Sequence, residues 1–351
     1  MKIENKLNNK NMNKPVGIIG SGSFGTALAV NFSKFAERVY LKCRSKEFAE
    51  ELKTKRYNEY YLKGVNLGEN IIITDDYGTV FKNCGIIFLA VPSIALKDTL
   101  MDIKKTRDKF DLSGCIFVNT AKGLGDKSME LPHKVFESVL GSSMLERYAV
   151  LSGPSFAAEV SRHLPTAVCI ASFNDKILDG LKTFFKNIIN FRIYTLNDVK
   201  GVELGGALKN IIALAAGISD GLGLGNNARA ALLTRGIVEI TRFGEALGAD
   251  KQTFTGLSGL GDLMLTAASD LSRNRSVGIR IGKGESLDSI LKGMKMVAEG
   301  VATTKSVHNI AKEKNIYMPI TEVVYSVLYE GLKPSDAIIK LLERDIKDEF
   351  I

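Results

Sequence analysis

The first half of the chain alternates between short apolar runs and helical stretches, from Val16 to about Thr195. This order predicts an α/β domain with a Rossmann-type, doubly wound parallel sheet. The run 85–91, which Pro92 stops, is apolar throughout, as a strand covered on both faces should be. The predicted strands are Val16–Ile19, Val39–Leu41, Ile71–Ile73, Gly85–Val91, Ile116–Asn119, Ala149–Leu151, Ala167–Ala171 and Phe191–Tyr194.

After Asp198 the pattern changes to long segments with apolar residues at helical spacing, broken by glycines. The first helix, from about 198 to 217, is apolar on most sides, which predicts a buried central helix. Further helices are expected near 227–247, 287–294, 299–313, 319–330 and 334–345. The pattern therefore predicts an α/β dinucleotide-binding domain over residues 15–197 and an all-α, substrate-binding domain over residues 198–351.

Residues 1–14 are polar and Asn-rich, without the apolar core of a secretory signal. We expect a disordered extension. No apolar run long enough to cross a bilayer is evident, so no stable membrane insertion is expected.

The net charge of the chain is +8, and its Lys and Arg residues are scattered among Asp and Glu without a basic tract. This distribution argues against a nucleic-acid partner and favours a small phosphorylated substrate together with a dinucleotide.

The four cysteines form no C-x-x-C pair and no zinc spacing. We expect buried, reduced thiols and a cytoplasmic location. The three histidines are far apart in sequence, and no metal is implied.

The most informative motif is Gly20-Ser21-Gly22-Ser23-Phe24-Gly25, a G-x-G-x-x-G string directly after the first predicted strand and before a predicted helix. In that position the first glycine permits a tight turn, and the second lets the backbone approach a pyrophosphate. The third lets helix and strand pack closely. The N-terminal amides of the helix can then receive the phosphates.

The end of the second strand lacks the carboxylate that binds the ribose in NAD-selective enzymes. Lys42, Arg44 and Lys46 occur there instead. Because a guanidinium pairs with phosphate and stacks on adenine, we expect Arg44 to contact a 2′-phosphate, with NADPH preferred and NADH possible. The alternative is a solvated loop edge.

Lys209 is a single cation within an apolar helical segment. Desolvation would lower its pKa toward the working pH, as a general acid or base requires. The alternative is a lysine whose head reaches water while its stem packs in the core. Lys122 follows a predicted strand, at the edge of the sheet where ligands bind, so we expect it to contact substrate.

Asp262 lies among small and apolar residues and needs a cationic partner, which Lys209 or Lys122 could supply. Arg273 with Asn274, after Ser272, forms a candidate phosphate clamp. Arg275 is interpreted as a surface or supporting residue. The alternative for the whole stretch is a capped helix terminus with solvated arginines.

From Val16 to about Gly331 the chain resembles the bacterial type of NAD(P)-dependent glycerol-3-phosphate dehydrogenase. The glycine motif is shared by many dehydrogenases, whereas the later motifs, in this order, are specific. The segments that carry the resemblance are Gly20–Ala29, Ala121–Leu124, Leu151–Glu159, Val202–Asn210, Thr255–Leu263, Ser272–Arg275 and Glu299–Gly300.

The resemblance implies a 6-phosphogluconate-dehydrogenase-like helical C-terminal domain, a homodimer, and reversible reduction of dihydroxyacetone phosphate to sn-glycerol 3-phosphate for phospholipid synthesis. It implies that Lys209 is the proton acceptor, with Lys122 and Asp262 at the reacting centre. The implied substrate contacts are Lys122, Gly153, Ser155, Lys209, Asp262, Ser272, Arg273 and Asn274. The implied cofactor contacts are Gly20, Gly22, Ser23, Phe24, Gly25, Arg44, Lys122, Ala157, Arg273, Val297 and Glu299.

Two other functions are compatible with part of the pattern. A reductase for a carboxylate-bearing substrate could share the two-domain plan, but such enzymes often use a histidine base, and His163 beside Arg162 is the only histidine near a candidate site. A non-catalytic redox sensor would have no need for proton-transfer groups such as Lys209.

Overall fold

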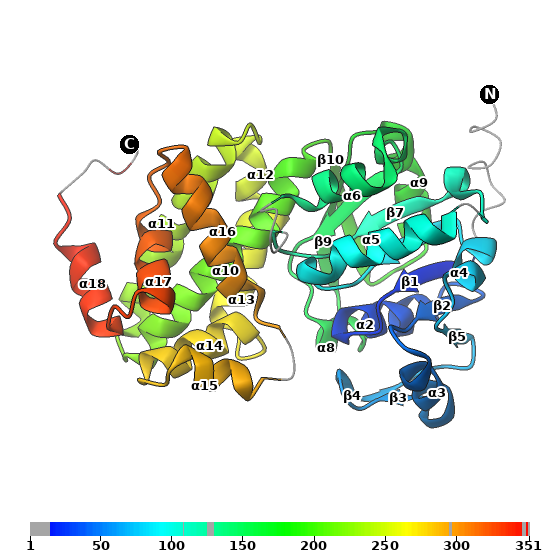
Figure 1. Cartoon of the computed structure of the whole chain (residues 1–351), viewed down its shortest axis with the longest axis horizontal. Coiled ribbons are helices and arrows are strands. Elements are labelled where there is room, and N and C mark those ends of the chain that lie inside the picture. The colour runs from blue at the N-terminus through cyan, green and yellow to red at the C-terminus, as the bar shows by residue number, and fades with distance from the viewer. Residues whose placement is uncertain (1–14, 108, 125–129, 295–296, 346–348, 350–351) are drawn as a thin grey trace. The chain divides into compact units, whose positions relative to one another are not determined.

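The computed structural model of the chain describes residues 15–107, 109–124, 130–294, 297–345 and 349 (Figure 1). The predicted disordered extension, residues 1–14, lies outside the described residues. The chain divides into two compact units after Glu203. This division falls within helix α10, Val199–Gly221, whereas the boundary predicted after residue 197 falls just before that helix.

The first unit contains an eight-stranded sheet in the order β10-β9-β8-β7-β6-β1-β2-β5. All eight predicted strands are present, within one or two residues at most ends. β1 pairs in parallel with β2 and β6, so the carboxyl ends of these strands meet at one edge of the sheet. The strands are β1 Val16–Ile19, β2 Val39–Lys42, β5 Ile71–Thr74, β6 Ile86–Leu89, β7 Ile116–Asn119, β8 Tyr148–Ser152, β9 Thr166–Ser172 and β10 Phe191–Leu196.

The expectation of a fully parallel sheet is wrong at one position. β9 pairs antiparallel with β8, with Ser152 opposite Cys169, and β10 runs parallel to β9. The crossover between two parallel strands is usually a full α-helix that packs on the sheet. The connection from β8 to β9 holds only α8, Ala157–Val160, so the chain returns as an antiparallel neighbour.

Helices cover both faces of this sheet, and each face has its own apolar core. Phe32, Phe88 and Phe185 belong to one core, while Phe117, Phe136 and Tyr148 belong to the other. The first face is covered by α2 Ser23–Phe32, α3 Lys46–Lys55 and α9 Asp175–Phe185. The second is covered by α4 Tyr77–Asn83, α5 Ser93–Arg107 and α6 Pro132–Leu140. Two short helical segments, η1 Leu112–Gly114 and α7 Ser142–Leu145, complete this unit.

The sequence pattern does not predict the small hairpin between α3 and β5. It consists of β3, Tyr57–Asn58, and β4, Leu62–Asn66, which pair antiparallel. The residue that ends α3, Arg56, adopts the left-handed conformation with φ 54°. A strand of two residues is too short for any alternation of polar and apolar positions to be recognised.

The described part of the second unit is helical. Five predicted helices, α11 and α15 to α18, are present, but three short ones between residues 251 and 282 are not predicted by periodicity. The helices after α10 are α11 Gly225–Ala246, α12 Lys251–Thr255, α13 Asp262–Ala268, α14 Arg273–Gly282, α15 Leu287–Lys292, α16 Glu299–Glu313, α17 Pro319–Tyr329 and α18 Pro334–Leu342, with a π-helical turn at Leu257–Gly261.

α10 corrects the expectation that no apolar run is long enough to cross a bilayer. Among the described residues it is the single helix long and apolar enough, by length and composition, to cross a membrane. Every residue of its most apolar window is buried in the protein, so burial in the core accounts for its composition. The prediction of a buried central helix is confirmed.

Glycines let α14 approach α10 closely. A Cβ on Gly217 would lie 2.1 Å from the carbonyl oxygen of Arg275, and one on Gly278 would lie 2.2 Å from that of Leu214. Neither position therefore accepts a side chain without a backbone shift. This contact places the start of α14 beside the helix that carries Lys209.

Candidate active site

The glycine motif forms a turn between β1 and α2 in which two of its glycines are required by space. Gly20 has φ +112°, and a Cβ there would lie 2.4 Å from the Ala90 carbonyl oxygen. A Cβ on Gly25 would lie 1.9 Å from the Gly20 carbonyl oxygen. A Cβ on Gly22 would meet nothing within 4 Å. The protein itself does not fill the space beside Gly22, as expected where a ligand approaches the backbone.

The N-terminus of α2 adjoins that space. Gly22 is the residue that precedes the helix, and no side chain caps its first turn. Ser23 and Phe24 are the first two helical residues. The first N–H groups of a helix lack intrahelical partners and carry the positive end of the dipole, so they attract anions. The predicted pyrophosphate site therefore fits the local structure.

The three cations expected at the end of β2 do not form one group. Lys42 is buried, and its Nζ lies 3.9 Å from the centroid of the Tyr77 ring. Burial lowers the pKa of Lys42. Arg44 and Lys46 are exposed, and Ser45 between them caps α3 by accepting a hydrogen bond from the Phe48 N–H. Arg44 and Lys46 are thus the members of the group that an incoming anion can reach.

At the carboxyl ends of β7 and β8, three predicted substrate residues lie together. Lys122 Nζ donates to the Gly153 carbonyl oxygen at 2.9 Å, and Ser155 Oγ donates to the same oxygen at 3.0 Å. Gly153 has φ +130°, a conformation that a side chain would strain. Ala157 begins α8 two residues beyond Ser155.

In the second unit, Lys209 on α10 and Asp262 at the start of α13 form a buried ion pair. Lys209 Nζ lies 2.5 Å from Asp262 Oδ1, and the two side chains are 7% and 1% exposed. Of the two cations that could neutralise Asp262, Lys209 is the observed partner. The carboxylate opposes the desolvation that would otherwise disfavour the ammonium form of Lys209.

Thr266 completes this cluster and was not predicted. Its Oγ1 accepts a hydrogen bond from Lys209 Nζ at 2.8 Å and donates to the Asp262 carbonyl oxygen at 2.6 Å. The signal available in sequence is its spacing, because residues four apart share one face of a helix. That signal needs a helix starting at Asp262, which periodicity does not predict.

The start of α14 joins two of the predicted cofactor residues. Arg273 Nη1 donates to the Val297 carbonyl oxygen at 2.9 Å, and Glu299 begins α16 two residues later. Ser272 Oγ accepts from the Arg275 N–H at 3.2 Å, so it caps α14. The cap that the alternative interpretation expected is thus present, and it leaves the predicted contact of Ser272 with the substrate untested.

Asn274 is buried, and its amide is engaged within the unit. Its Nδ2 donates to Asn210 Oδ1 at 2.8 Å, and its Oδ1 accepts from the Gly300 N–H at 3.0 Å. Asn210, the neighbour of Lys209, is another residue that the sequence analysis did not single out. Asn274 therefore links α10, α14 and α16 around the start of α14.

Arg275 is a supporting residue and not a surface one. Its guanidinium is buried and pairs with Asp220 at 2.8 Å and with Asp270 at 2.5 Å. Burial lowers the pKa of Arg275, but the hydrogen bonds that its guanidinium donates to these two carboxylates outweigh burial and raise the pKa above its ordinary value.

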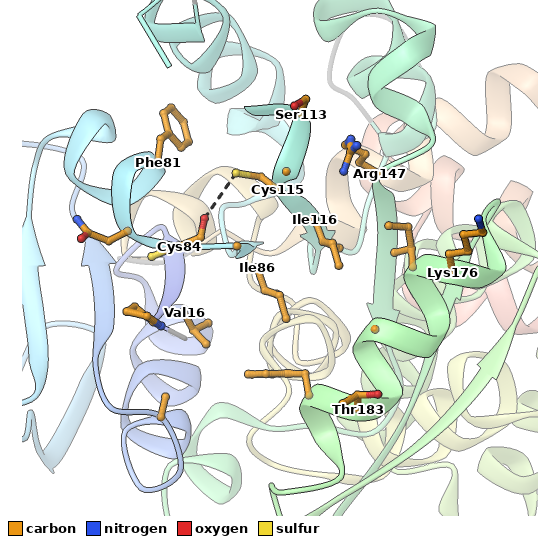
Figure 2. Close-up of a pocket in the computed structure, with 18 of the residues that line it drawn as sticks. Val16, Phe81, Cys84, Ile86, Ser113, Cys115, Ile116, Arg147, Lys176 and Thr183 are labelled. Carbon is orange, nitrogen blue, oxygen red and sulfur yellow. Dashed lines mark hydrogen bonds between the residues drawn. The ribbon is translucent and has the colours of Figure 1, made fainter. Parts of the chain in front are cut away.

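A hollow in the first unit, drawn in Figure 2, lies at the amino ends of β1, β6 and β7. Its volume is about 1220 Å³, and none of the predicted site residues lines it. Cys115 Sγ donates to the Cys84 carbonyl oxygen at 3.5 Å in its wall (Figure 2). All four cysteines are buried and free, as predicted. Ligands of such sheets bind at the opposite, carboxyl edge, so we assign no role in the reaction to this hollow.

Comparison with known proteins identifies the family. Residues 15–178 match the family model of the NAD-dependent glycerol-3-phosphate dehydrogenase N-terminus, and residues 198–339 match that of its C-terminus. A glycerol-3-phosphate dehydrogenase (NAD(P)+) of Thermoanaerobacter sp. is 46% identical over 335 residues, covering 95% of this chain and 98% of that protein.

Solved structures agree with this match. The crystal structure of glycerol-3-phosphate dehydrogenase from Coxiella burnetii has a TM-score of 0.87 and 37% identity, covering 95% of this chain and all of that one. The glycerol-3-phosphate dehydrogenase of Plasmodium falciparum has a TM-score of 0.84 and 26% identity, covering 99% of both chains. The chain therefore belongs to the NAD(P)-dependent glycerol-3-phosphate dehydrogenases, a family of oxidoreductases.

Proposed function

We propose that this chain catalyses the reversible NAD(P)H-dependent reduction of dihydroxyacetone phosphate to sn-glycerol 3-phosphate, with Lys209 as the proton-transfer group. The observation that carries the assignment of Lys209 is its buried pairing with Asp262 and Thr266. A solvated lysine would have no need of a buried carboxylate, whereas a buried general acid must be held in its charged form until it gives up a proton.

In the reductive direction the nicotinamide, when bound, supplies a hydride to the carbonyl carbon of the substrate. The Lys209 ammonium donates a proton to the oxygen that becomes the hydroxyl. Asp262 holds that ammonium in place and balances its charge. In the oxidative direction Lys209 accepts the hydroxyl proton. A preorganised cation beside the developing alkoxide stabilises the transition state more than the ground state.

The other site residues divide between substrate and cofactor. Lys122, Gly153, Ser155, Ser272, Arg273 and Asn274 are proposed to contact the phosphorylated substrate, Lys122 by its ammonium and Arg273 by its forked donors. The proposed cofactor contacts are Gly20, Gly22, Ser23, Phe24, Gly25, Arg44, Lys122, Ala157, Arg273, Val297 and Glu299.

Use of NAD(P) follows from the family, and we propose that NADPH is the preferred form. The support is the exposed Arg44 at the end of β2, where an NAD-selective protein would carry a carboxylate. NADH remains a usable cofactor, since the pyrophosphate loop serves both dinucleotides.

The product would supply glycerophospholipid synthesis, and the resemblance supports a homodimer in the cytoplasm. Light scattering on the purified protein tests the dimer, which predicts about twice the chain mass of 38.3 kDa. A mass of one chain at micromolar concentration would contradict it.

The reaction itself is tested with the purified protein and the Lys209→Ala variant. We expect NADPH oxidation with dihydroxyacetone phosphate and not with 2-keto acids. We expect the variant to lose roughly two or more orders of magnitude in turnover, as for loss of a general base. Oxidation with 2-keto acids alone would contradict the substrate, and unchanged turnover would remove Lys209 from the mechanism.

A further inference from the structure

The unpredicted β3–β4 hairpin makes direct contact with the glycine loop. Asn58 on β3 is fully buried, although both its neighbours in sequence are polar or exposed. Its Nδ2 donates to the Ser21 carbonyl oxygen at 2.9 Å and to Thr26 Oγ1 at 2.7 Å. Its Oδ1 accepts from the Tyr61 N–H at 3.1 Å. One amide thus links the hairpin turn to both ends of the loop.

A second contact ties the same hairpin to the start of α2. Ser23 Oγ donates to the Tyr61 carbonyl oxygen at 2.8 Å. Thr26 Oγ1 in turn donates to the Ser21 carbonyl oxygen at 3.2 Å, so that oxygen receives two hydrogen bonds. The loop between Gly20 and Gly25 is therefore tied to the hairpin by two side-chain donors, Asn58 on the hairpin and Ser23 on the loop.

Because the peptide is planar, the direction of the Ser21 carbonyl determines the direction of the Gly22 N–H. In a trans peptide the carbonyl oxygen and the N–H of the next residue point in opposite directions. Because Asn58 fixes the direction of the Ser21 carbonyl, it also directs the Gly22 N–H away from the hairpin. Gly22 is the residue beside which the protein leaves open space.

We propose that Asn58 is a positioning residue that orients the Ser21–Gly22 peptide for binding of the dinucleotide pyrophosphate. Without its donors the Ser21 carbonyl loses its strongest partner, and the peptide can rotate so that an oxygen faces the phosphates. This inference rests on the proposed placement of the pyrophosphate at the glycine loop. It predicts a loss of cofactor affinity with little change in the chemistry of the bound complex.

The test uses the full chain with the Asn58→Ala substitution. We expect the dissociation constant of NADPH to rise about tenfold or more, as for loss of about 1.4 kcal/mol or more in binding. The turnover at saturating NADPH should stay within about twofold, and the KM for dihydroxyacetone phosphate should not change. Binding of ADP-ribose, which contains the pyrophosphate, should weaken, whereas binding of adenosine 2′-monophosphate should not.

Asn70→Ala is the matched control. Asn70 Nδ2 donates to the carbonyl oxygens of Ser33 and Ala36, at the far end of α2, at 2.8 and 3.3 Å. Asn70→Ala removes an amide that hydrogen-bonds next to the other end of the same helix, so a purely structural effect would appear in both variants. An equal rise of the NADPH dissociation constant in both, or no rise in folded Asn58→Ala, would overturn the proposal.

Three further variants keep the test decisive. If Asn58→Ala does not fold, Thr26→Val is used instead, because it removes one of the two acceptors of Asn58 Nδ2 and the second donor to the Ser21 carbonyl oxygen. Thr26→Ser restores both bonds. We expect weaker NADPH binding in the first variant and recovery in the second. Equal affinities in these two would overturn the proposal. Gly22→Val tests the site itself: if it binds NADPH normally, the placement of the pyrophosphate fails, and if it alone binds weakly, only the role of Asn58 fails.

Discussion

The glycine loop and the cluster around Lys209 reach function by opposite means. The loop presents backbone groups, and its two constrained glycines are set by contacts of 2.4 Å or less between a hypothetical Cβ and backbone oxygens. The Lys209 cluster depends on side chains that are almost fully buried and that neutralise one another at 2.5 Å. The first region is specified by sterics over a few residues, and the second by electrostatics between distant segments.

The two regions are therefore sensitive to different kinds of substitution. A backbone site is damaged by added atoms, even those of a methyl group, where the protein already fills the space. A buried ion pair is damaged when one charge is removed, because the other remains buried without compensation. Substitutions that respect this division should separate cofactor capture from proton transfer.

The largest effect is expected from Asp262→Ala. Removing the carboxylate leaves the Lys209 ammonium buried, which should lower the free energy of unfolding by about 3–5 kcal/mol as well as abolishing most turnover. Denaturant unfolding followed by circular dichroism measures the first quantity. The double variant Lys209→Met with Asp262→Leu should recover much of the stability and none of the activity. A single variant as stable as the wild type would contradict the ion-pair account.

A similar but smaller loss of stability is expected at one glycine and not at another. Gly25→Ala places a Cβ against the Gly20 carbonyl oxygen and should cost about 3 kcal/mol. Gly22→Ala meets no atom of the protein, so it should cost at most about 1 kcal/mol, the value of a poorer helix cap. Thermal unfolding of both variants without cofactor checks this contrast. Equal losses would break the distinction between the two glycines.

Arg44→Asp tests whether the positive charge of Arg44 makes the protein prefer NADPH to NADH. A charge-assisted hydrogen bond to a 2′-phosphate contributes about 1.5–3 kcal/mol, so the ratio of kcat/KM with NADPH to that with NADH should fall by about tenfold or more. Lys46→Asp, at the other exposed cation, is the control and should change the ratio less. An unchanged ratio in Arg44→Asp would show that Arg44 does not select the cofactor.

The smallest effect concerns Glu239, a buried carboxyl on α11. It accepts hydrogen bonds from the N–H groups of Ile320 and Thr321 at the start of α17, and from the Thr321 hydroxyl. Burial raises its pKa above the ordinary value of 4.5. Its contribution to stability is therefore complete below pH 4.5 and declines as the pH rises through the raised pKa.

Glu239→Gln cannot titrate, so it should cost more stability at acidic pH than at pH about 8. Denaturant midpoints of wild type and variant across this range give the difference directly. Glu245→Gln, an exposed position on the same helix, should show no such trend. A loss of stability in Glu239→Gln that increases with pH would contradict the prediction that Glu239 contributes most to stability at acidic pH.

The sequence predicts the glycine loop better than the Lys209 cluster, because the loop depends on local interactions and the cluster on long-range ones. The glycine loop is recognisable because a tight turn between a strand and a helix requires particular residues next to one another in sequence. Lys209 is recognisable as an unusual cation, but its partner Thr266 is 57 residues away, and only the fold brings them together. Asn58 gave no signal, because a buried amide on a two-residue strand looks like any polar loop residue.

The reversal at β9 was missed for a related reason. Strand runs report which residues form a sheet, and the direction of a strand depends on what its connection can span. The sequence therefore predicts where β8 and β9 lie along the chain but not that β9 runs antiparallel to β8.

The most direct test measures the NADPH dissociation constant and the turnover number of Gly22→Val and Lys209→Ala on the same preparations. We expect Gly22→Val to bind NADPH at least about tenfold more weakly than the wild type. We expect Lys209→Ala to bind NADPH like the wild type and to lose roughly two or more orders of magnitude in turnover. If both variants lose affinity and turnover together, or if Lys209→Ala retains turnover, the separation of cofactor capture from proton transfer is contradicted.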